Sequence, residues 1–212
     1  MDLSNPWLIA SYAAAGIALA ACAGMRAFLP LLVVGIAGRY AGFQLSEGYH
    51  WLTTDGALVT FAVAVIAETL ADKVPVLDHA LDTVGMIVKP AVGTMVAAAM
   101  FVHLPPFAAT LLGLAVGGTI ATTVGLAKAK VRIVSSLTTG TVLNPVLSFV
   151  EDLVATVIAA VALIAPFLAL VFIVGIVIYA VRRLHRAFGP PPPSKADPKS
   201  AGPSAGPGAG SL

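Results

Sequence analysis

The sequence predicts an all-α, polytopic membrane protein, and three observations lead to that fold class. Hydrophobic residues make up 58% of the 212 residues and charged residues only 10%, whereas soluble domains carry about 25% charged residues. The mean hydropathy is +0.96. The apolar runs are continuous and rich in Ala, Leu, Val and Ile, unlike the roughly ten-residue alternating segments of a membrane β-barrel.

About six transmembrane spans are expected, because a span needs about 20 apolar residues. The first apolar stretch, residues 7–37, is too long for one straight helix and is interrupted at Gly24, Met25, Arg26 and Pro30. We therefore expect a helix, a break and a half-helix that together cross the membrane once. The other expected spans cover residues 52–72, 90–104, 107–127, 145–165 and 166–181.

Two further segments complete the expected organisation. Residues 75–89 are amphipathic, which predicts an interfacial or re-entrant piece before a helix that starts at Pro90. Residues 189–212 are rich in Pro, Gly, Ala and Ser, a composition that cannot bury a core and is typical of a disordered tail. The chain thus divides into a transmembrane domain, residues 1–188, and a cytoplasmic tail.

Basic residues orient this topology. Lysines and arginines at residues 128–132 and 182–186 form two clusters, and the positive-inside rule makes both cytoplasmic. Residues 38–50 are then outside, and the N-terminus is inside if residues 7–37 cross once. Three spans in each half would give the halves opposite orientations, so a 3+3 inverted repeat is a hypothesis.

Acidic residues within apolar runs are the candidate functional groups. Glu68 and Asp72 are four residues apart, on one face of a helix. Charges at bilayer depth are costly and usually face a protein interior or a water-filled path. Glu68 would carry a proton or bind a cation, or else be a structural helix-end charge. Asp72 next to Lys73 is also typical of a helix-end charge pair at the interface.

A second polar group opens the fifth expected span. Asn144, Ser148 and Glu151 form a stripe along one helix face, which would line a path or bond to a neighbouring helix. Glu151 is preferred to Asp152, because adjacent helical residues point about 100° apart. The helix would start at Asn144, and Pro145 would occupy its first turn.

Arg26, at the break, is the expected partner of an internal carboxylate or of an anionic substrate, since an unpaired Arg would be expensive there. Asp78 and Asp82 could share a cation at their i, i+4 spacing, or form a solvated polar face. Gly113, Gly117 and Gly118 form a small-residue face that predicts close helix packing.

Several function classes have no support in the sequence. The net charge is only +2, so no nucleic-acid partner is expected. The lone Cys22 excludes an intrachain disulfide and a multi-cysteine metal site. No nucleophile elbow, P-loop, dinucleotide fingerprint or zinc-protease motif occurs in the sequence, so neither an enzyme nor a cofactor is predicted.

Five segments together resemble a bacterial membrane family described as domain of unknown function 4126. The most specific is Glu-Thr-Leu-Ala-Asp-Lys-Val-Pro with the following Leu-Asp-His-Ala-Leu-Asp. The matching segments are residues 24–32, 68–75, 77–82, 90–93 and 144–152. Members often carry Leu-Asn-Ala-Tyr where this chain has Met25-Arg26-Ala27-Phe28, so Arg26 is a departure. The resemblance implies a small multi-pass protein of the bacterial inner membrane and no particular substrate.

The leading functional prediction is a transporter or channel for an ion or small solute, as a possible homo-oligomer in the lipid bilayer. Glu68, Asp72, Glu151, Arg26, Asn144 and Ser148 would bind or couple to the ion or solute. The first alternative is a lipid-handling protein or metal-dependent enzyme, with Asp72, Asp78 and Asp82 at the cytoplasmic headgroups. The second is a membrane scaffold whose Pro-rich tail recruits a partner.

Overall fold

The computed structural model describes residues 5–72, 75–139 and 144–188. Within these ranges the regular structure is entirely helical: eight α-helices, a 3-10 helix and a π-helical segment. In chain order the elements are α1 (Pro6–Met25), α2 (Phe28–Tyr40), η1 (Glu47–Thr53), α3 (Asp55–Ala71), α4 (Pro75–Met100), α5 (Pro106–Leu112), the π-helical η2 (Gly113–Gly118), α6 (Thr119–Thr139), α7 (Asn144–Ile164) and α8 (Pro166–Phe188).

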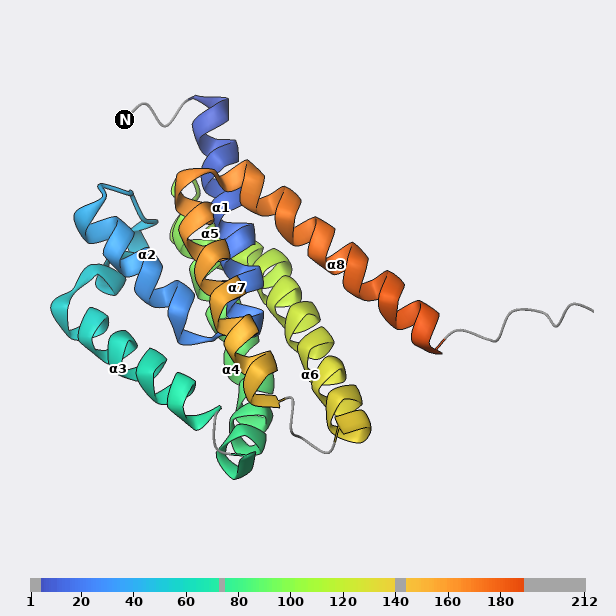
Figure 1. Cartoon of the computed structure of the whole chain (residues 1–212). Coiled ribbons are helices and arrows are strands. Elements are labelled where there is room, and N and C mark those ends of the chain that lie inside the picture. The colour runs from blue at the N-terminus through green and yellow to red at the C-terminus, as the bar shows by residue number, and fades with distance from the viewer. Residues whose placement is uncertain (1–4, 73–74, 140–143, 189–212) are drawn as a thin grey trace, which may run out of the picture.

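Successive long helices run in opposite directions through one bundle (Figure 1). The C-terminal ends of α1, α3 and α6 gather at the same end as the starts of α2, α4 and α7. We call this the junction end, because α1 meets α2 there. α8 turns back from the top of α7 and extends away from the bundle as an arm.

The central helix is α1, which packs against α4, α6, α7 and α8. It begins where the Asn5 side chain accepts the Trp7 N–H at 3.0 Å. Its buried face is mostly alanine, with Leu19 and Cys22 fully buried among them. Small side chains let helix backbones approach closely, which is a main source of helix association in lipid.

Glycines let the backbones of α4 and η2 pack directly against each other. A Cβ on Gly93 would lie 2.7 Å from the Gly117 carbonyl oxygen, and one on Gly113 would lie 2.6 Å from the Thr94 carbonyl oxygen. Gly113, Gly117 and Gly118 are all buried. The predicted small-residue packing face is therefore confirmed.

Several helices have the length and apolarity of membrane spans. In the described residues, Pro6–Met25, Thr83–Met100 and Pro106–Val131 qualify, and η1 with α3, bent by 67°, would be a fourth. α3 also exposes a row of apolar side chains: Val59, Val63, Ile66 and Leu70. Such a surface is suited to lipid rather than water. These features support a membrane protein, while the count of six spans stays a prediction.

The first apolar stretch follows a path different from the expected one. The helix breaks at Arg26, as predicted, but the chain then reverses, so that α2 runs back beside the bundle (Figure 1). Arg26 has an extended backbone, with φ −130° and ψ 114°, which ends one helix and redirects the chain. The start of α1 lies at the end opposite the junction end, and the side of the membrane on which the N-terminus lies stays a prediction.

The predicted helix start at Pro90 is wrong. α4 is continuous from Pro75 to Met100 with Pro90 inside it, so residues 75–89 and 90–100 are one helix rather than an interfacial segment and a span. Proline is tolerated within membrane helices because neighbours re-satisfy the freed backbone groups. The Thr94 hydroxyl donates to the Pro90 carbonyl oxygen at 2.8 Å, but the carbonyl that Pro90 leaves without an N–H partner is that of Met86.

The later boundaries are closer to expectation. α7 begins at Asn144, as predicted, and α8 begins at Pro166. α6 continues to Thr139, so the helix extends twelve residues beyond the expected span of residues 107–127. The proline-rich tail lies outside the described residues.

Candidate functional site

The α1–α2 break leaves a helix start that its own sequence does not cap. The first N–H groups of a helix have no partner within the helix, and Ala27, at the N-cap position of α2, has no side-chain acceptor. Glu68, on α3, supplies one from a distance. Its carboxylate accepts the N–H of Ala27 at 2.9 Å and of Phe28 at 3.3 Å. A negative charge also suits the positive end of the helix dipole.

The other side of the break is held by a cation. Lys128, on α6, donates to the Met25 carbonyl oxygen at 3.1 Å. This places an ammonium at the negative end of the α1 dipole. The same Nζ lies 2.9 Å from Glu151 Oε2, and both side chains are largely buried. Each end of the break is therefore held by a side chain of the opposite charge from another helix.

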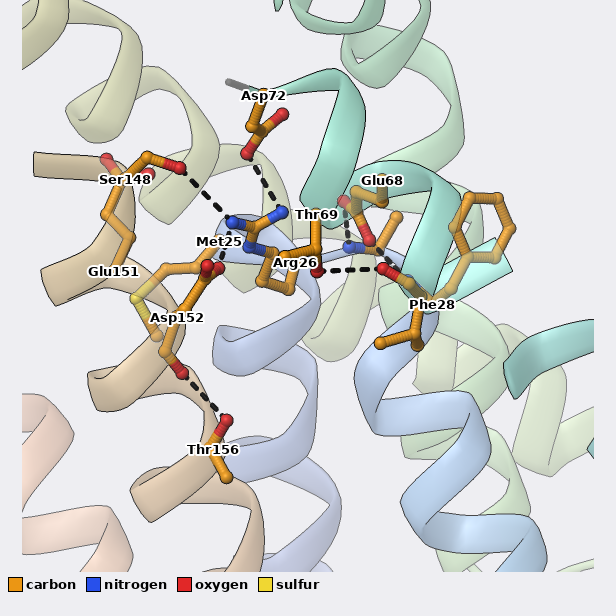
Figure 2. A network of polar contacts seen from close by, with 12 residues as sticks. Met25, Arg26, Phe28, Glu68, Thr69, Asp72, Ser148, Glu151, Asp152 and Thr156 are labelled. Atoms are coloured by element: carbon orange, nitrogen blue, oxygen red, sulfur yellow. Dashed lines mark hydrogen bonds and ion pairs between the residues drawn. The ribbon is translucent and has the colours of Figure 1, made fainter. Parts of the chain in front are cut away.

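Between these two contacts lies Arg26, whose side chain is only 3% exposed. One terminal nitrogen lies 2.9 Å from Asp72 Oδ2, on α3. The other forms an ion pair with Asp152 and donates to the Ser148 hydroxyl at 3.4 Å, both on α7. Figure 2 shows the guanidinium between these two helices, with Glu68 at the adjacent helix start. Arg26 thus joins α3 to α7 across the end of α1.

A cavity of about 170 Å³ adjoins this cluster. It lies between the α1–α2 junction, α3, α4 and α6, and its charged lining residues are Glu68, Asp72, Lys89 and Lys128. Its apolar lining includes Phe28, Val84 and Val88.

The charges of the cluster and the cavity nearly balance. We define the junction cluster as the charged side chains that meet at the break or line this cavity: Arg26, Glu68, Asp72, Lys89, Lys128, Glu151 and Asp152. Its four carboxylates face three cationic side chains, an excess of one negative charge if all are ionised. Near balance is what burial requires, because an uncompensated buried charge is costly.

A model of the protein family described as Domain of unknown function (DUF4126) matches residues 13–186. The chain belongs to this family. The matched region contains the whole junction cluster. No curated protein and no solved structure matches the chain.

Five of the residues predicted for the site of this DUF4126 protein lie together. Arg26, Glu68, Asp72 and Ser148 are linked directly or through adjacent positions, and Glu151 joins them through Lys128 at the end of α1. The prediction that Arg26 pairs with an internal carboxylate is confirmed.

Asp72 lies at the C-cap of α3, and its expected charge pair with Lys73 stays a prediction because Lys73 lies outside the described residues. The Asp72 carboxylate faces Arg26 in the interior and its side chain is 6% exposed. Lys73 and the side chains of Asp78, Asp82 and Asn144 lie outside the described part of the chain. In the described residues, no group of three or more His, Cys, Asp or Glu side chains is placed to hold a metal ion.

Three cluster members were missed by reasoning from the sequence. Asp152 was set aside in favour of Glu151, yet the two neighbours reach different cations, Arg26 and Lys128. Lys128 was assigned only to a cytoplasmic basic cluster. A signal existed for it: Lys128 is seven residues after the buried Ala121, so both share one helix face. Lys89 was treated only as a span boundary, and nothing in its local sequence marks it.

Proposed function

We propose that this protein is a small membrane transporter or channel for an ion or small solute, with the junction cluster as its coupling element. The observation that carries the proposal is the α1–α2 break, where the half-buried Glu68 binds the start of α2 and the buried Lys128 binds the end of α1. Interrupted helices with charged groups at their ends are typical of substrate and ion sites in secondary transporters. Buried ionisable residues in membrane segments commonly belong to ion or proton pathways.

Glu68 is the residue proposed to couple ion binding to movement. Its two backbone contacts hold the start of α2 against α3. Protonation, or a cation that competes for the carboxylate, would weaken both contacts and release α2. Arg26 would then exchange between its partners on α3 and α7, which gives the two helices a route to move relative to each other. The cluster lies at one end of the bundle, so the step would control access from one membrane face.

The finer topology belongs to the same proposal. Lys128 and the arginines at residues 182–186 would make the junction end cytoplasmic under the positive-inside rule. The site would then face the cytoplasm of a bacterial inner membrane, with the tail of residues 189–212 on that side. The 3+3 inverted repeat and a homo-oligomer remain hypotheses within this proposal.

The test is to reconstitute the purified protein in proteoliposomes and record currents on a solid-supported membrane. Gradients of protons, alkali cations and small anions would be applied one at a time. We expect a current with at least one ion, and a loss of roughly tenfold or more in Glu68→Gln. Glutamine keeps the size of the side chain and one carbonyl acceptor, so the variant removes charge with little change in packing.

Asp55→Asn is the matched control, because Asp55 lies in the first turn of α3, far along the helix from Glu68, and is 81% exposed. It should leave the current unchanged. Equal currents in native protein and Glu68→Gln would reject Glu68 as the coupling group. Absence of current across all gradients, from protein that remains monodisperse, would reject ion transport.

The alternatives have less support. A metal-dependent enzyme would use Asp72 as a cation ligand, whereas Asp72 forms an ion pair with Arg26. A scaffold that acts through its tail can be separated by deleting residues 189–212, which should leave transport unchanged under our proposal.

A further inference from the structure

Two cavities adjoin at Lys89. The charged cavity of about 170 Å³ lies on the α3 side of α4. A second cavity, of about 240 Å³, lies on the α6 side, and Gly85 and Lys89 line both. Apart from Lys89 and Thr122, the second cavity is lined by side chains without polar groups or by glycine: Gly85, Met86, Pro90, Ala121, Gly125, Leu126 and Ala129. A charged compartment and an apolar compartment therefore meet at one lysine.

Two glycines make room for the Lys89 side chain. A Cβ on Gly85 would lie 3.0 Å from Lys89 Cε and 3.3 Å from its Nζ. A Cβ on Gly125 would lie 3.6 Å from Lys89 Cδ. The alkyl chain of Lys89 thus lies against bare backbone of α4 and α6, and a larger residue at position 85 would displace its ammonium.

The position of the cavities along the helices matches a membrane interface. α1 has 20 residues and is therefore about 30 Å long, which equals the usual thickness of the hydrocarbon core. The junction end, where α1 stops, then lies at the level of the lipid headgroups. Val84, at the rim of the charged cavity, is 57% exposed.

We propose that the two cavities form one binding site for a phospholipid whose headgroup carries a primary ammonium. The lipid phosphate would bind Lys89 and Lys128, and the ammonium would bind Glu68 and Asp72. An acyl chain would occupy the apolar cavity. The site shares Glu68, Asp72 and Lys128 with the junction cluster, but lipid binding does not require ion transport and goes beyond the function proposed above.

Charge complementarity selects this ligand class. The carboxylates of Glu68 and Asp72 oppose a simple anion, and the ammonium groups of Lys89 and Lys128 oppose a simple cation. A headgroup with both charges can exchange with the contacts that these groups already make, among them Asp72 with Arg26 and Lys128 with Glu151. Its size also fits, because a cavity of about 150 Å³ accommodates a molecule as large as benzene. The apolar compartment favours a lipid over a soluble zwitterion of the same headgroup chemistry.

Native mass spectrometry of the delipidated, full-length protein in detergent would test the site. Phosphatidylethanolamine, phosphatidylcholine and phosphatidylglycerol would be added separately at equal concentration, with soluble phosphoethanolamine as a fourth ligand. We expect phosphatidylethanolamine to bind most tightly. The quaternary ammonium of phosphatidylcholine has no N–H to donate, and phosphatidylglycerol has no ammonium. Equal binding of all three lipids would overturn the proposal, and binding of phosphoethanolamine as tight as that of the lipid would replace the lipid with a soluble zwitterion.

Two variants with matched controls locate the binding. Lys89→Gln should weaken phosphatidylethanolamine binding roughly tenfold, as expected for the loss of a charge-assisted hydrogen bond, whereas the exposed Lys130→Gln should not. Gly85→Val keeps every charge but displaces Lys89, and should also weaken binding, whereas Gly175→Val, with open space around its Cβ, should not. Unchanged binding in folded Lys89→Gln and Gly85→Val would reject the site whatever the outcome of the current measurements.

Discussion

Two arginines tie the α2 region to α3, and they do so in contrasting surroundings. Arg26, just before α2, pairs with Asp72 at the C-terminal end of α3, with an N–O distance of 2.9 Å. Arg39, in the last turn of α2, pairs with Asp55 in the first turn of α3, at 2.8 Å. The distances are nearly equal, but Arg26 is 3% exposed and Asp55 is 81% exposed.

The difference teaches that burial, and not pair geometry, decides what an ion pair contributes. The exposed pair can exchange its partner for water, and Arg39 also donates to the Thr53 carbonyl oxygen. Such pairs contribute about 0–1 kcal/mol. The buried pair is shielded from water, so removal of one member leaves a desolvated charge. The junction cluster is therefore where substitutions should have the largest effects.

Among these variants, Arg26→Met should lower the free energy of unfolding most. It leaves Asp72 and Asp152 without their shared cation, and we expect the free energy of unfolding to fall by about 3–5 kcal/mol. The yield of monodisperse protein on size exclusion, and the thermal unfolding temperature in detergent, would measure the loss. Adding Asp72→Asn and Asp152→Asn should recover part of it. A stable Arg26→Met protein without these additions would contradict the assignment of Arg26 as the central charge.

Glu68→Ala should have an intermediate effect, about 1–2 kcal/mol, because it removes the acceptor for two N–H groups at the start of α2. Hydrogen exchange of the Ala27 and Phe28 amides should become faster, while amides in the middle of α1 stay protected. Thr54→Ala is the comparison at the other end of α3, where the Thr54 hydroxyl oxygen accepts the Ala57 N–H at 3.3 Å. Exchange near residue 27 should not respond to that change. Unaltered exchange of Ala27 and Phe28 in Glu68→Ala would show that Glu68 does not hold the start of α2.

Asp55→Asn should have the smallest effect, below about 1 kcal/mol. The difference from native protein should shrink further as salt is raised, since screening acts mainly on exposed pairs. Thermal unfolding in detergent at low and high salt is the measurement. A loss of stability comparable to that of Arg26→Met would mean that the exposed Arg39–Asp55 pair contributes as much as the buried Arg26–Asp72 pair.

Features that depend on local sequence were predictable. Arg26, between Gly24 and Pro30, predicts a break in the first helix, and Asn144 followed by Pro145 predicts the start of α7; both are confirmed. The glycines at 113, 117 and 118 predict a packing face, because small residues let helix backbones approach closely. The need of Arg26 for a carboxylate also follows from the residue alone, because a bare buried charge is too costly.

Features that depend on partners far apart in the chain were not predictable. Asp72, Asp152 and Glu151 are chemically similar, and only the arrangement of α3, α6 and α7 assigns two of them to Arg26 and one to Lys128. The local sequence predicts that a helix begins at Pro90, but Pro90 lies inside α4. Packing against neighbouring helices outweighs the lost backbone hydrogen bond.

By itself the sequence determined an all-helical chain with apolar helices suited to a membrane, a broken first helix and charges that had to be paired. The tertiary structure alone decided that the chain reverses at Arg26, that Glu68 holds the start of α2, and that Lys128 pairs with Glu151 while Lys89 lines a cavity with Glu68 and Asp72. The physical reason is one of range. Helix formation and apolarity are set by residues a few positions apart, whereas the choice of partner for a buried charge depends on which helices are brought together.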